Sequence, residues 1–283
     1  MSALLFHDGQ FLRDDKLLVG AGNRGLRYGD GVFETMKVNR ATIQLGSLHM
    51  KRLFAALELL EFDCPAFFTP DYLLEKVTQL AARNSHEKLG RVRLMIYRGD
   101  GGLYDPANHY PHHIIQTWEL PEANHAWNEN GLVVGIHHKA QKAADALANC
   151  KTNNYLTYVM GALEAKREKW NDALVLNTNG RIADATIANL FLVKNGSLVT
   201  PSLSEGPVAG VMRQYLLEKL GAAGYPLIEM AITEEMLAEA DEVFLTNSSY
   251  GIRWVGEIGS VKYESRYTKD IYRQVIEPLF SQH

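Results

Sequence analysis

The sequence predicts an α+β protein of two domains, and three observations carry this prediction. The chain has 283 residues, whereas a single hydrophobic core rarely grows beyond ~250–300 residues. Segments with the two-residue period of strands are interspersed with segments whose apolar residues recur at helical spacing. The stretch from Trp118 to Asn130 is polar and rich in turn formers, as connections between domains often are. We therefore place a small first domain at 1–119, a linker at 120–129 and a larger second domain at 130–283.

The first domain is expected to combine a sheet with two helices. Its predicted strands are Leu4–Phe6, Phe11–Leu12, Gly31–Val38, Thr42–Leu45 and Arg91–Tyr97. The first two form a hairpin, because the turn sequence His7-Asp8-Gly9 lies between them. Apolar residues spaced three and four apart predict helices over Leu48–Leu60 and Leu73–Leu80.

The second domain is expected to be richer in strands. Its predicted strands are Leu132–Ile136, Ala173–Leu176, Leu190–Val193, Ser197–Thr200 and Glu242–Leu245. An Ala-rich stretch before Lys151 has a helical composition, and the helix after it is expected to bury one apolar face. That face is formed by Leu156, Val159, Met160 and Leu163. A further helix is predicted to start after Gly210 and run through Leu220, and another follows Thr233, which is a good N-cap followed by two glutamates.

Composition narrows the class of partner. Hydrophobic residues make up 46% and charged residues 22%, as in folded globular proteins. The formal charge is −4 without runs of like charge, which argues against nucleic acid and acidic membranes as partners. The two cysteines, Cys64 and Cys150, are too few for a disulfide framework or a metal cage. With no basic leader and no run of roughly 18 apolar residues, we expect a cytoplasmic protein with a small-molecule partner and no metal.

Lys151 and the segment around Gly210 are the first candidates for chemistry. A lysine by itself is usually a surface residue, but Lys151 has small or polar neighbours on both sides. Gly210 stands directly before a predicted helix, so the N–H groups of Val211 and Met212 would be available to an anion such as phosphate. Alternatively, Gly210 only ends a loop.

Two charged residues and a hydroxyl cluster add further candidates. Asp184 lies in a mostly apolar hairpin segment and is either a turn residue or a functional carboxylate. Arg52, on a predicted helix, is either a surface residue or a phosphate ligand. The hydroxyl groups of Thr246-Asn-Ser-Ser249 follow a predicted strand, where such residues commonly form turns.

Taken in order, these pieces resemble fold-type IV pyridoxal-phosphate (PLP) enzymes, the class IV group of branched-chain aminotransferases, D-amino-acid aminotransferases and aminodeoxychorismate lyases. The likeness covers more than 200 positions. It is carried by Arg27-Tyr-Gly-Asp-Gly-Val-Phe-Glu-Thr35, His49-Met-Lys-Arg52, Arg98-Gly-Asp-Gly-Gly102, the lysine segment, Asn189-Leu-Phe191, Gly210-Val-Met-Arg213 and Ala240-Asp-Glu-Val-Phe244. The resemblance implies a small N-terminal α/β sandwich, a larger barrel-like domain with helices, and a homodimer.

The resemblance also implies roles for individual residues. Lys151 would be the Schiff-base lysine and the proton shuttle at the substrate Cα, and Asp184 the partner of the pyridine nitrogen. Phosphate ligands would be Arg52, the N–H groups of Val211 and Met212, and Ser248. Val208 would pack on the ring, and Tyr155 would hydrogen-bond the phenolic oxygen. Substrate contacts would come from Arg27, Tyr28, Phe33, Arg93, Arg98 and Ser249.

Three positions depart from the family pattern. Asp184 stands where members usually have glutamate, so the shorter side chain must move closer or act through water. Met212 replaces a threonine, which keeps the backbone donor and loses a hydroxyl. Leu103 lies where D-amino-acid aminotransferases and some lyases carry an arginine for the substrate carboxylate. Arg27, Arg93 and Arg98 are the candidates to replace that arginine.

The motif details are most similar to the lyase branch. They favour a 4-amino-4-deoxychorismate lyase, which yields pyruvate and 4-aminobenzoate for folate synthesis. The alternative is an aminotransferase for branched-chain or D-amino acids with 2-oxoglutarate as acceptor. A third possibility, from another class, is a cofactor-free binding protein that kept the fold.

Overall fold

The computed structural model describes residues 3–281, apart from the side chain of His125. The chain forms two compact units. The first contains residues 3–124 together with Cys150–Asn154, and the second contains His125–Asn149 together with residues 155–281. The chain thus passes between units within the predicted linker, but the segment that carries Lys151 belongs to the first unit rather than to the second.

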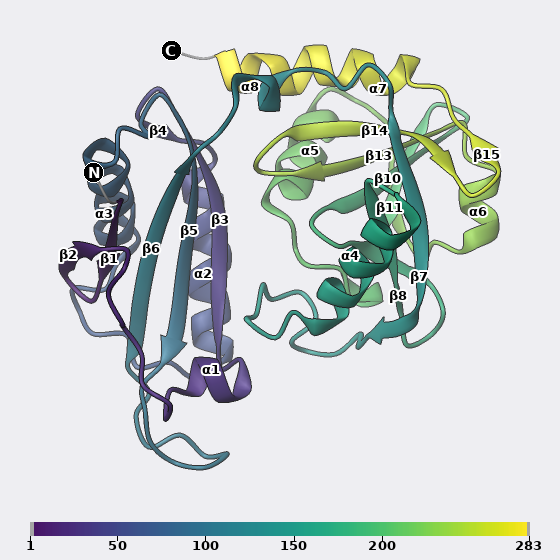
Figure 1. Cartoon of the computed structure of the whole chain (residues 1–283). Coiled ribbons are helices and arrows are strands. Elements are labelled where there is room, and N and C mark those ends of the chain that lie inside the picture. Colours follow the sequence, from purple (N-terminus) through teal and green to yellow (C-terminus); the bar gives the residue numbers. More distant parts are fainter. Residues whose placement is uncertain (1–2, 282–283) are drawn as a thin grey trace. The chain divides into compact units, whose positions relative to one another are not determined.

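The first unit is a six-stranded antiparallel sheet with order β2-β1-β6-β5-β3-β4. Its strands are β1 Leu4–His7, β2 Gln10–Arg13, β3 Gly31–Asn39, β4 Thr42–Ile43, β5 Leu89–Arg98 and β6 Pro111–Glu119. The short helix α1 (Arg24–Tyr28) precedes β3, whereas α2 (Gly46–Leu59) and α3 (Pro70–Arg83) cover one face of the sheet (Figure 1). Val32, Met36 and Leu94 from the sheet and Leu53 and Val77 from the helices meet in the core.

Strand β6 was not predicted from the sequence. It pairs with β5 from Gly90↔Glu119 to Arg98↔Pro111 and with β1. The leading proline and the polar pair His112-His113 hide the alternation of this strand. Both histidines contact the Asp8 carboxylate of the first hairpin turn, which explains why polar residues occur there.

The second unit is built on a nine-stranded sheet that is curled like a barrel. Its strands are β7 Leu132–Lys142, β8 Asp172–Asn177, β9 Ile182–Ala185, β10 Asn189–Lys194, β11 Ser197–Pro201, β12 Leu227–Met230, β13 Glu242–Asn247, β14 Gly251–Ile258 and β15 Val261–Lys262. The order is β12-β11-β10-β13-β14-β7-β8-β9, with β15 on β14. Although β9 ends this path, it returns against β10 and β11. The predicted α+β class is confirmed.

The helices of the second unit surround this sheet (Figure 1). They are α4 Leu156–Glu168, α5 Val211–Ala222, α6 Glu234–Ala238, α7 Arg266–Ile271 and α8 Glu277–Ser281. Short 3-10 turns occur at Glu122–His125 and Leu203–Glu205, and a π-helical turn at Tyr272–Ile276 joins α7 to α8. As expected, the Thr233 side chain caps α6 by accepting from the Met236 N–H. Among the described residues, no helix is long and apolar enough to cross a membrane.

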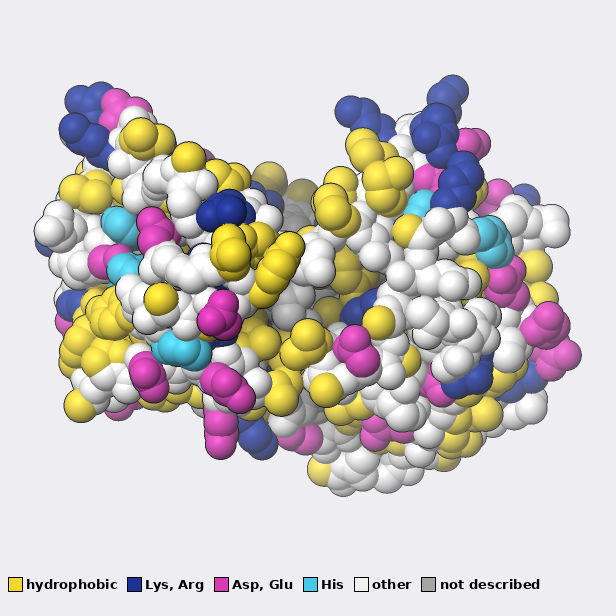
Figure 2. Space-filling view, turned by 90° about the horizontal axis from the view of Figure 1, so that it is seen from below, with side chains coloured by type: hydrophobic (Ala, Val, Ile, Leu, Met, Phe, Trp, Pro, Cys, Tyr) yellow, Lys and Arg dark blue, Asp and Glu magenta, His cyan; other side chains and the backbone are white. Residues whose placement is uncertain are grey.

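Two expectations about the chain around Lys151 were wrong. The Ala-rich stretch at 143–149 forms turns, because the Asn149 side chain donates to Leu203 O and Pro207 O and tertiary contacts override helix propensity. The apolar face of α4 is exposed to solvent. Figure 2 shows that hydrophobic side chains also occur on the surface of the molecule among polar ones. The members of the α4 face are exposed by 71% (Leu156), 46% (Val159), 48% (Met160) and 53% (Leu163). Instead, Gly161 faces the sheet, where an added Cβ would lie 3.0 Å from Thr186 Cγ2.

Candidate active site

The Lys151 segment is fixed to β3 by backbone hydrogen bonds. The Phe33 N–H donates to Lys151 O (2.9 Å), and the Asn153 N–H donates to Gly31 O (2.9 Å). Gly31 is required here, since an added Cβ would lie 2.1 Å from Ile96 O. Lys151 Nζ is held 4.5 Å from the centroid of the Phe33 ring, which makes it a cation–π partner of that ring.

The Phe33 ring has a second cationic neighbour. Arg93, which pairs with Thr35 across β3 and β5, places Cζ 3.9 Å from the ring centroid. Of the predicted substrate residues, Phe33 and Arg93 are therefore brought together beside Lys151. Arg27 instead contacts its neighbour in the sequence, with Cζ 5.1 Å from the centroid of the Tyr28 ring.

On the opposite face of β3, Glu34 holds Arg52. Arg52 Nε donates to Glu34 Oε1 (2.8 Å), and Nη2 donates to Oε2. His49 Nδ1 lies 2.7 Å from the same Oε2. A bidentate pair of this kind fixes the plane of the guanidinium. Arg52, the predicted phosphate ligand, thus has a defined orientation while its side chain stays 13% exposed.

The charges of this cluster compensate one another. Burial alone raises the pKa of Glu34, but the Arg52 and His49 charges and their hydrogen bonds outweigh it and lower the pKa to about 2. Burial lowers the pKa of His49, opposed by Glu34, and the positive charges of Arg52 and Lys151 add to the lowering. Glu34 is therefore an anion at neutral pH.

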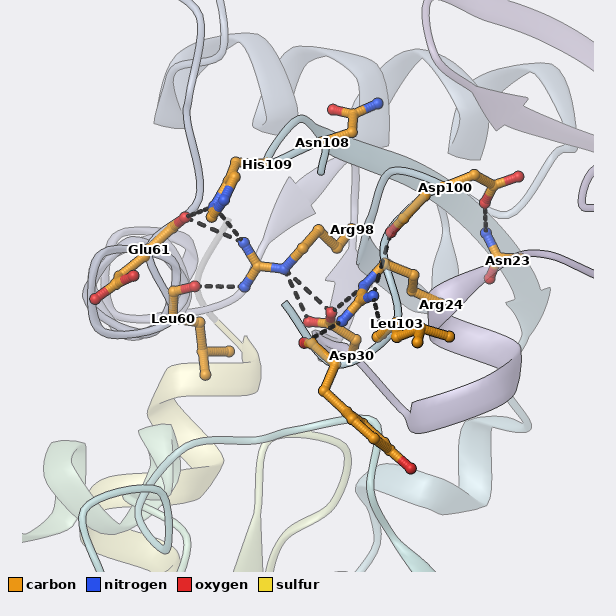
Figure 3. Close-up of polar contacts among 12 residues, drawn as sticks. Asn23, Arg24, Asp30, Leu60, Glu61, Arg98, Asp100, Leu103, Asn108 and His109 are labelled. Atoms are coloured by element: carbon orange, nitrogen blue, oxygen red, sulfur yellow. Dashed lines mark hydrogen bonds and ion pairs between the residues drawn. The ribbon is translucent and has the colours of Figure 1, made fainter. Parts of the chain in front are cut away.

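A second buried arginine pair fixes the loop after β5 (Figure 3). Asp30 accepts from Arg24 Nε (2.8 Å) and from Arg98 Nε (3.1 Å). Arg24 also donates to the carbonyl oxygens of Gly101, Leu103 and Tyr104 (3.2, 2.6 and 3.0 Å). The Leu103 side chain is held outward, 66% exposed.

Arg98 is one of the predicted substrate residues, and its guanidinium is occupied by protein groups. Nη1 donates to Glu61 O (3.1 Å) and contacts His109 Nδ1 (3.0 Å), while Nη2 donates to Leu60 O. These contacts favour a role for Arg98 in fixing the loops of the first unit. Its role toward the substrate stays a prediction.

In the second unit, Asp184 lies on β9 and is buried. Its Oδ2 accepts from the Tyr158 hydroxyl (2.9 Å) and from the Val208 N–H (2.9 Å). Lys142 Nζ lies 3.5 Å from the same oxygen. Oδ1 is also buried, and no described residue donates a hydrogen bond to it. The carboxylate thus has one saturated oxygen and one that is available for a donor outside the protein.

The loop that supplies Val208 leads directly into α5. Asn189 Nδ2 donates to Val208 O (2.8 Å), and an added Cβ on Gly210 would lie 1.7 Å from Asn189 Oδ1. Gly210 is the N-cap of α5, without a side-chain cap among the described residues. The predicted seat for an anion at the Val211 and Met212 N–H groups therefore has the expected helix start.

The other predicted cofactor residues of this unit lie at turns and caps. Tyr155 is the N-cap of α4, and its ring centroid is 4.3 Å from that of Tyr158. Ser248 and Ser249 occupy the turn after β13, where the Ser249 N–H donates to Asn247 Oδ1 (2.9 Å). Ser248 is half-buried.

The model of the family "Amino-transferase class IV" matches residues 31–258. The chain belongs to this family. It is 32% identical to an aminodeoxychorismate lyase of Vibrio harveyi over 86% of this chain and 88% of that protein. It is 25% identical to the branched-chain-amino-acid aminotransferase of Escherichia coli over 98% of this chain and 91% of that protein.

A solved structure gives the same fold. The branched-chain aminotransferase of Thermoproteus uzoniensis, solved with norvaline, matches with a TM-score of 0.89 at 22% identity, covering 100% of this chain and 96% of that one. The resemblance to class IV enzymes is thus confirmed. The expected enzyme class and its cofactor, PLP, are confirmed at the level of this family.

These residues fit PLP. A PLP site needs a carboxylate for the protonated ring nitrogen, an anion seat for the phosphate and an amine for the aldehyde. Among the described residues, Asp184 Oδ1 is a buried acceptor without a donor, α5 begins at Gly210, which has no side chain to cap it, and Lys151 carries the amine. In the described part of the chain, no cluster of His, Cys, Asp or Glu has the arrangement of a metal site.

The residues that hold the predicted ones in place were not predicted from the sequence. Glu34 stands directly after Phe33, inside the motif from Arg27 to Thr35, and has no signal of its own. Tyr158 lies three residues after Tyr155, and no local pattern marks it as a contact of Asp184. Arg24 lies before the first motif, and only the polar turn Asn23-Arg24-Gly25 marks it. Each acts through tertiary contacts that spacing along the chain does not reveal.

We predict that Glu34→Gln destabilises the protein in a pH-dependent way. Removing one partner of a buried pair costs about 3 kcal/mol. The folded-state pKa of Glu34 is about 2 against an ordinary value of 4.5, so its stabilisation is complete above pH 4.5 and is lost as the pH falls towards 2. Urea unfolding of the cofactor-free protein should show the full deficit at pH 7 and a smaller one at pH 3. Glu75→Gln, on the exposed surface of α3, is the control; an equal deficit at both pH values would contradict the assignment.

Proposed function

We propose that this chain is a 4-amino-4-deoxychorismate lyase that releases pyruvate and 4-aminobenzoate. The observation that carries the proposal is the 32% identity to the Vibrio harveyi lyase over most of both chains. The aminotransferases that match along the chain do so at 24–26% identity. An aminotransferase for branched-chain or D-amino acids is the second candidate, favoured by the wider coverage of these matches.

In this proposal, PLP would be held by the residues that the family resemblance assigns. Asp184 Oδ1 would accept a hydrogen bond from the protonated ring nitrogen, Val208 would pack on the ring, and Tyr155 would hydrogen-bond the phenolic oxygen. Arg52, Ser248 and the N–H groups at the start of α5 would be the phosphate ligands. PLP, when bound, supplies an electron sink for the charge that develops at the amino-bearing carbon of the substrate. Lys151 forms the covalent bond to the cofactor.

The covalent chain supports this assignment. Asn149 is two residues before Lys151 and is fixed to the loop before α5: its side chain donates to Pro207 O (2.7 Å), and its carbonyl accepts from the Ala209 N–H (3.0 Å). Two residues span at most about 7 Å. Lys151 thus follows, by two residues along the chain, a residue that anchors the loop from which the Val208 N–H donates to Asp184.

The role of Lys151 in the reaction would be that of a base: its amine, when not bonded to PLP, would take the proton from the amino-bearing carbon of the substrate. The bond to the leaving group on the neighbouring carbon then breaks, and the remaining ring becomes aromatic. Arg93 and Arg27 are our candidates for binding the substrate carboxylates, and Arg93 is favoured because it shares the Phe33 ring with Lys151. Tyr28, Phe33 and Ser249 complete the proposed substrate contacts.

The third possibility, a cofactor-free binding protein, lacks support. It was raised because Asp184 and Met212 depart from the family pattern. The Asp184 carboxylate nevertheless keeps one oxygen without a donor, and α5 keeps its uncapped start. A buried carboxylate oxygen without a donor is costly, and a bound PLP ring nitrogen would supply that donor.

The test is an assay of products. The PLP-loaded protein is incubated with aminodeoxychorismate, and separately with L-leucine or D-alanine plus 2-oxoglutarate, while pyruvate, 4-aminobenzoate and glutamate are followed. We expect pyruvate with 4-aminobenzoate, and neither product from Lys151→Ala, which should also lack the visible band of the lysine-bound cofactor. Glutamate formed only from the amino acids would make the protein a transaminase.

We also propose that two copies associate through α4. The sequence places Leu156, Val159, Met160 and Leu163 on one stripe, and all four are exposed. Such a stripe at helical spacing is costly to leave in water. An antiparallel pairing about a two-fold axis would set Leu156 of one copy against Leu163 of the other and bury the stripe in a self-complementary contact.

We predict that Leu163→Glu dissociates this dimer, because it introduces one charge at each end of a small apolar contact. Ile228→Glu, at an equally apolar surface position that is 44% exposed on β12, is the matched control. Sedimentation velocity should give a dimer for the wild type and the control and a monomer for Leu163→Glu. A wild-type monomer, or a Leu163→Glu dimer, would exclude this interface.

A further inference from the structure

Asp184 is a carboxylate whose two oxygens have different surroundings. Oδ2 accepts from Tyr158 and Val208 at 2.9 Å each, whereas Oδ1 is buried and accepts from no described residue. A carboxylate attached through one methylene has little freedom to rotate when one oxygen is held from two directions. The orientation of Oδ1 is therefore fixed by the contacts of Oδ2.

The Val208 contact is itself rigid. On the peptide that carries the Val208 N–H, Pro207 O accepts from Asn149 Nδ2 (2.7 Å), and on the next peptide Val208 O accepts from Asn189 Nδ2 (2.8 Å). The peptide on each side of Val208 is thus anchored, and its N–H has a constant direction. The other donor to Asp184 Oδ2 is the hydroxyl of Tyr158, which is a single side-chain atom.

Tyr158 is suited to donate at every pH at which the enzyme would work. Its side chain packs with Val175 and Val208, and its ring lies 4.3 Å from that of Tyr155. Burial, followed by the Asp184 charge, raises the pKa of Tyr158 well above its ordinary value. The hydroxyl therefore stays protonated and donates to Asp184. The other ionisable groups near this carboxylate are Lys142, at 3.5 Å, and the buried Asp172.

We propose that Tyr158 is a positioning residue that compensates for the aspartate at position 184, by holding Oδ2 so that Oδ1 is presented to the ring nitrogen of PLP. The inference rests on the proposed cofactor site. A glutamate at this position would bring its carboxylate about one carbon–carbon bond farther, into the space where Tyr158 and Val208 now meet Oδ2. The short side chain and the tyrosine hydroxyl are thus matched to each other.

The test is a double-mutant cycle of Tyr158→Phe and Asp184→Glu, read by PLP affinity. Tyr158→Phe removes one hydrogen bond to a charged group, so we expect PLP to bind roughly ten- to a hundredfold more weakly. Asp184→Glu alone should also weaken binding. In the double variant the longer carboxylate no longer meets the hydroxyl. The loss of PLP affinity in the double variant should therefore be smaller than the product of the losses in the two single variants.

A second readout is the pH midpoint of the visible band of the bound cofactor. With Asp184 less firmly placed, the ring nitrogen holds its proton less tightly, and the proton on the lysine nitrogen should be lost at higher pH. Tyr158→Phe should therefore raise the midpoint. Tyr263→Phe removes a buried hydroxyl that donates to Leu237 O (2.9 Å) in the same unit and should change neither affinity nor midpoint.

The outcomes separate this inference from the proposed function. If the wild-type protein binds no PLP, the proposed site itself fails. If the wild type binds PLP and Tyr158→Phe matches it in affinity and midpoint, Tyr158 does not position Asp184. Losses that simply multiply in the double variant would show that the two positions are independent and would also overturn the inference.

Discussion

The proposed cofactor site depends on one interaction, the hydrogen bonding of the buried Asp184 carboxylate. Desolvating a carboxylate is costly, and a buried oxygen without a donor adds to that cost. Asp184 Oδ2 is compensated by Tyr158, by the Val208 N–H and by nearby Lys142, but no described residue compensates Oδ1. A protonated ring nitrogen would remove that cost. The surrounding loop, with Asn189 and Gly210 packed against each other, serves to hold the carboxylate in this state.

In the first unit, buried groups again hold a predicted ligand in place, and here the ligand is the cation Arg52. Glu34 fixes the guanidinium of Arg52, and His49 supports Glu34 from behind. The backbone of β3 fixes the Lys151 segment, and Phe33 on the same strand holds the lysine amine. Successive residues of one strand thus position two of the proposed cofactor ligands from its opposite faces. The binding residues are placed by groups that do not themselves touch the cofactor in this proposal.

The sequence was sufficient to predict the elements with strong local signals. The hairpin at β10 and β11 has Asn195-Gly196 with φ values of 49° and 75°, which is the conformation that such dipeptides favour. Local signals failed where tertiary contacts decide. The polar His112-His113 pair hid β6, the Asn149 side chain holds the Ala-rich stretch in turns, and α4 packs with Gly161 close to Thr186 while its apolar stripe faces solvent. Likewise, motifs located Lys151, Arg52 and Asp184, but their supports are distant in sequence and were found only in the structure.

The central claim is that Lys151 bonds covalently to PLP, and trapping of that bond tests it most directly. The PLP-loaded protein is reduced with borohydride, digested and examined by mass spectrometry for the peptide that carries the pyridoxyl group. The chain provides two internal competitors, Lys37, which is fully buried with a pKa lowered by burial to about 7, and Lys142 beside Asp184. We predict the label on Lys151 alone. A label on Lys37 or Lys142 with Lys151 unmodified would contradict the account.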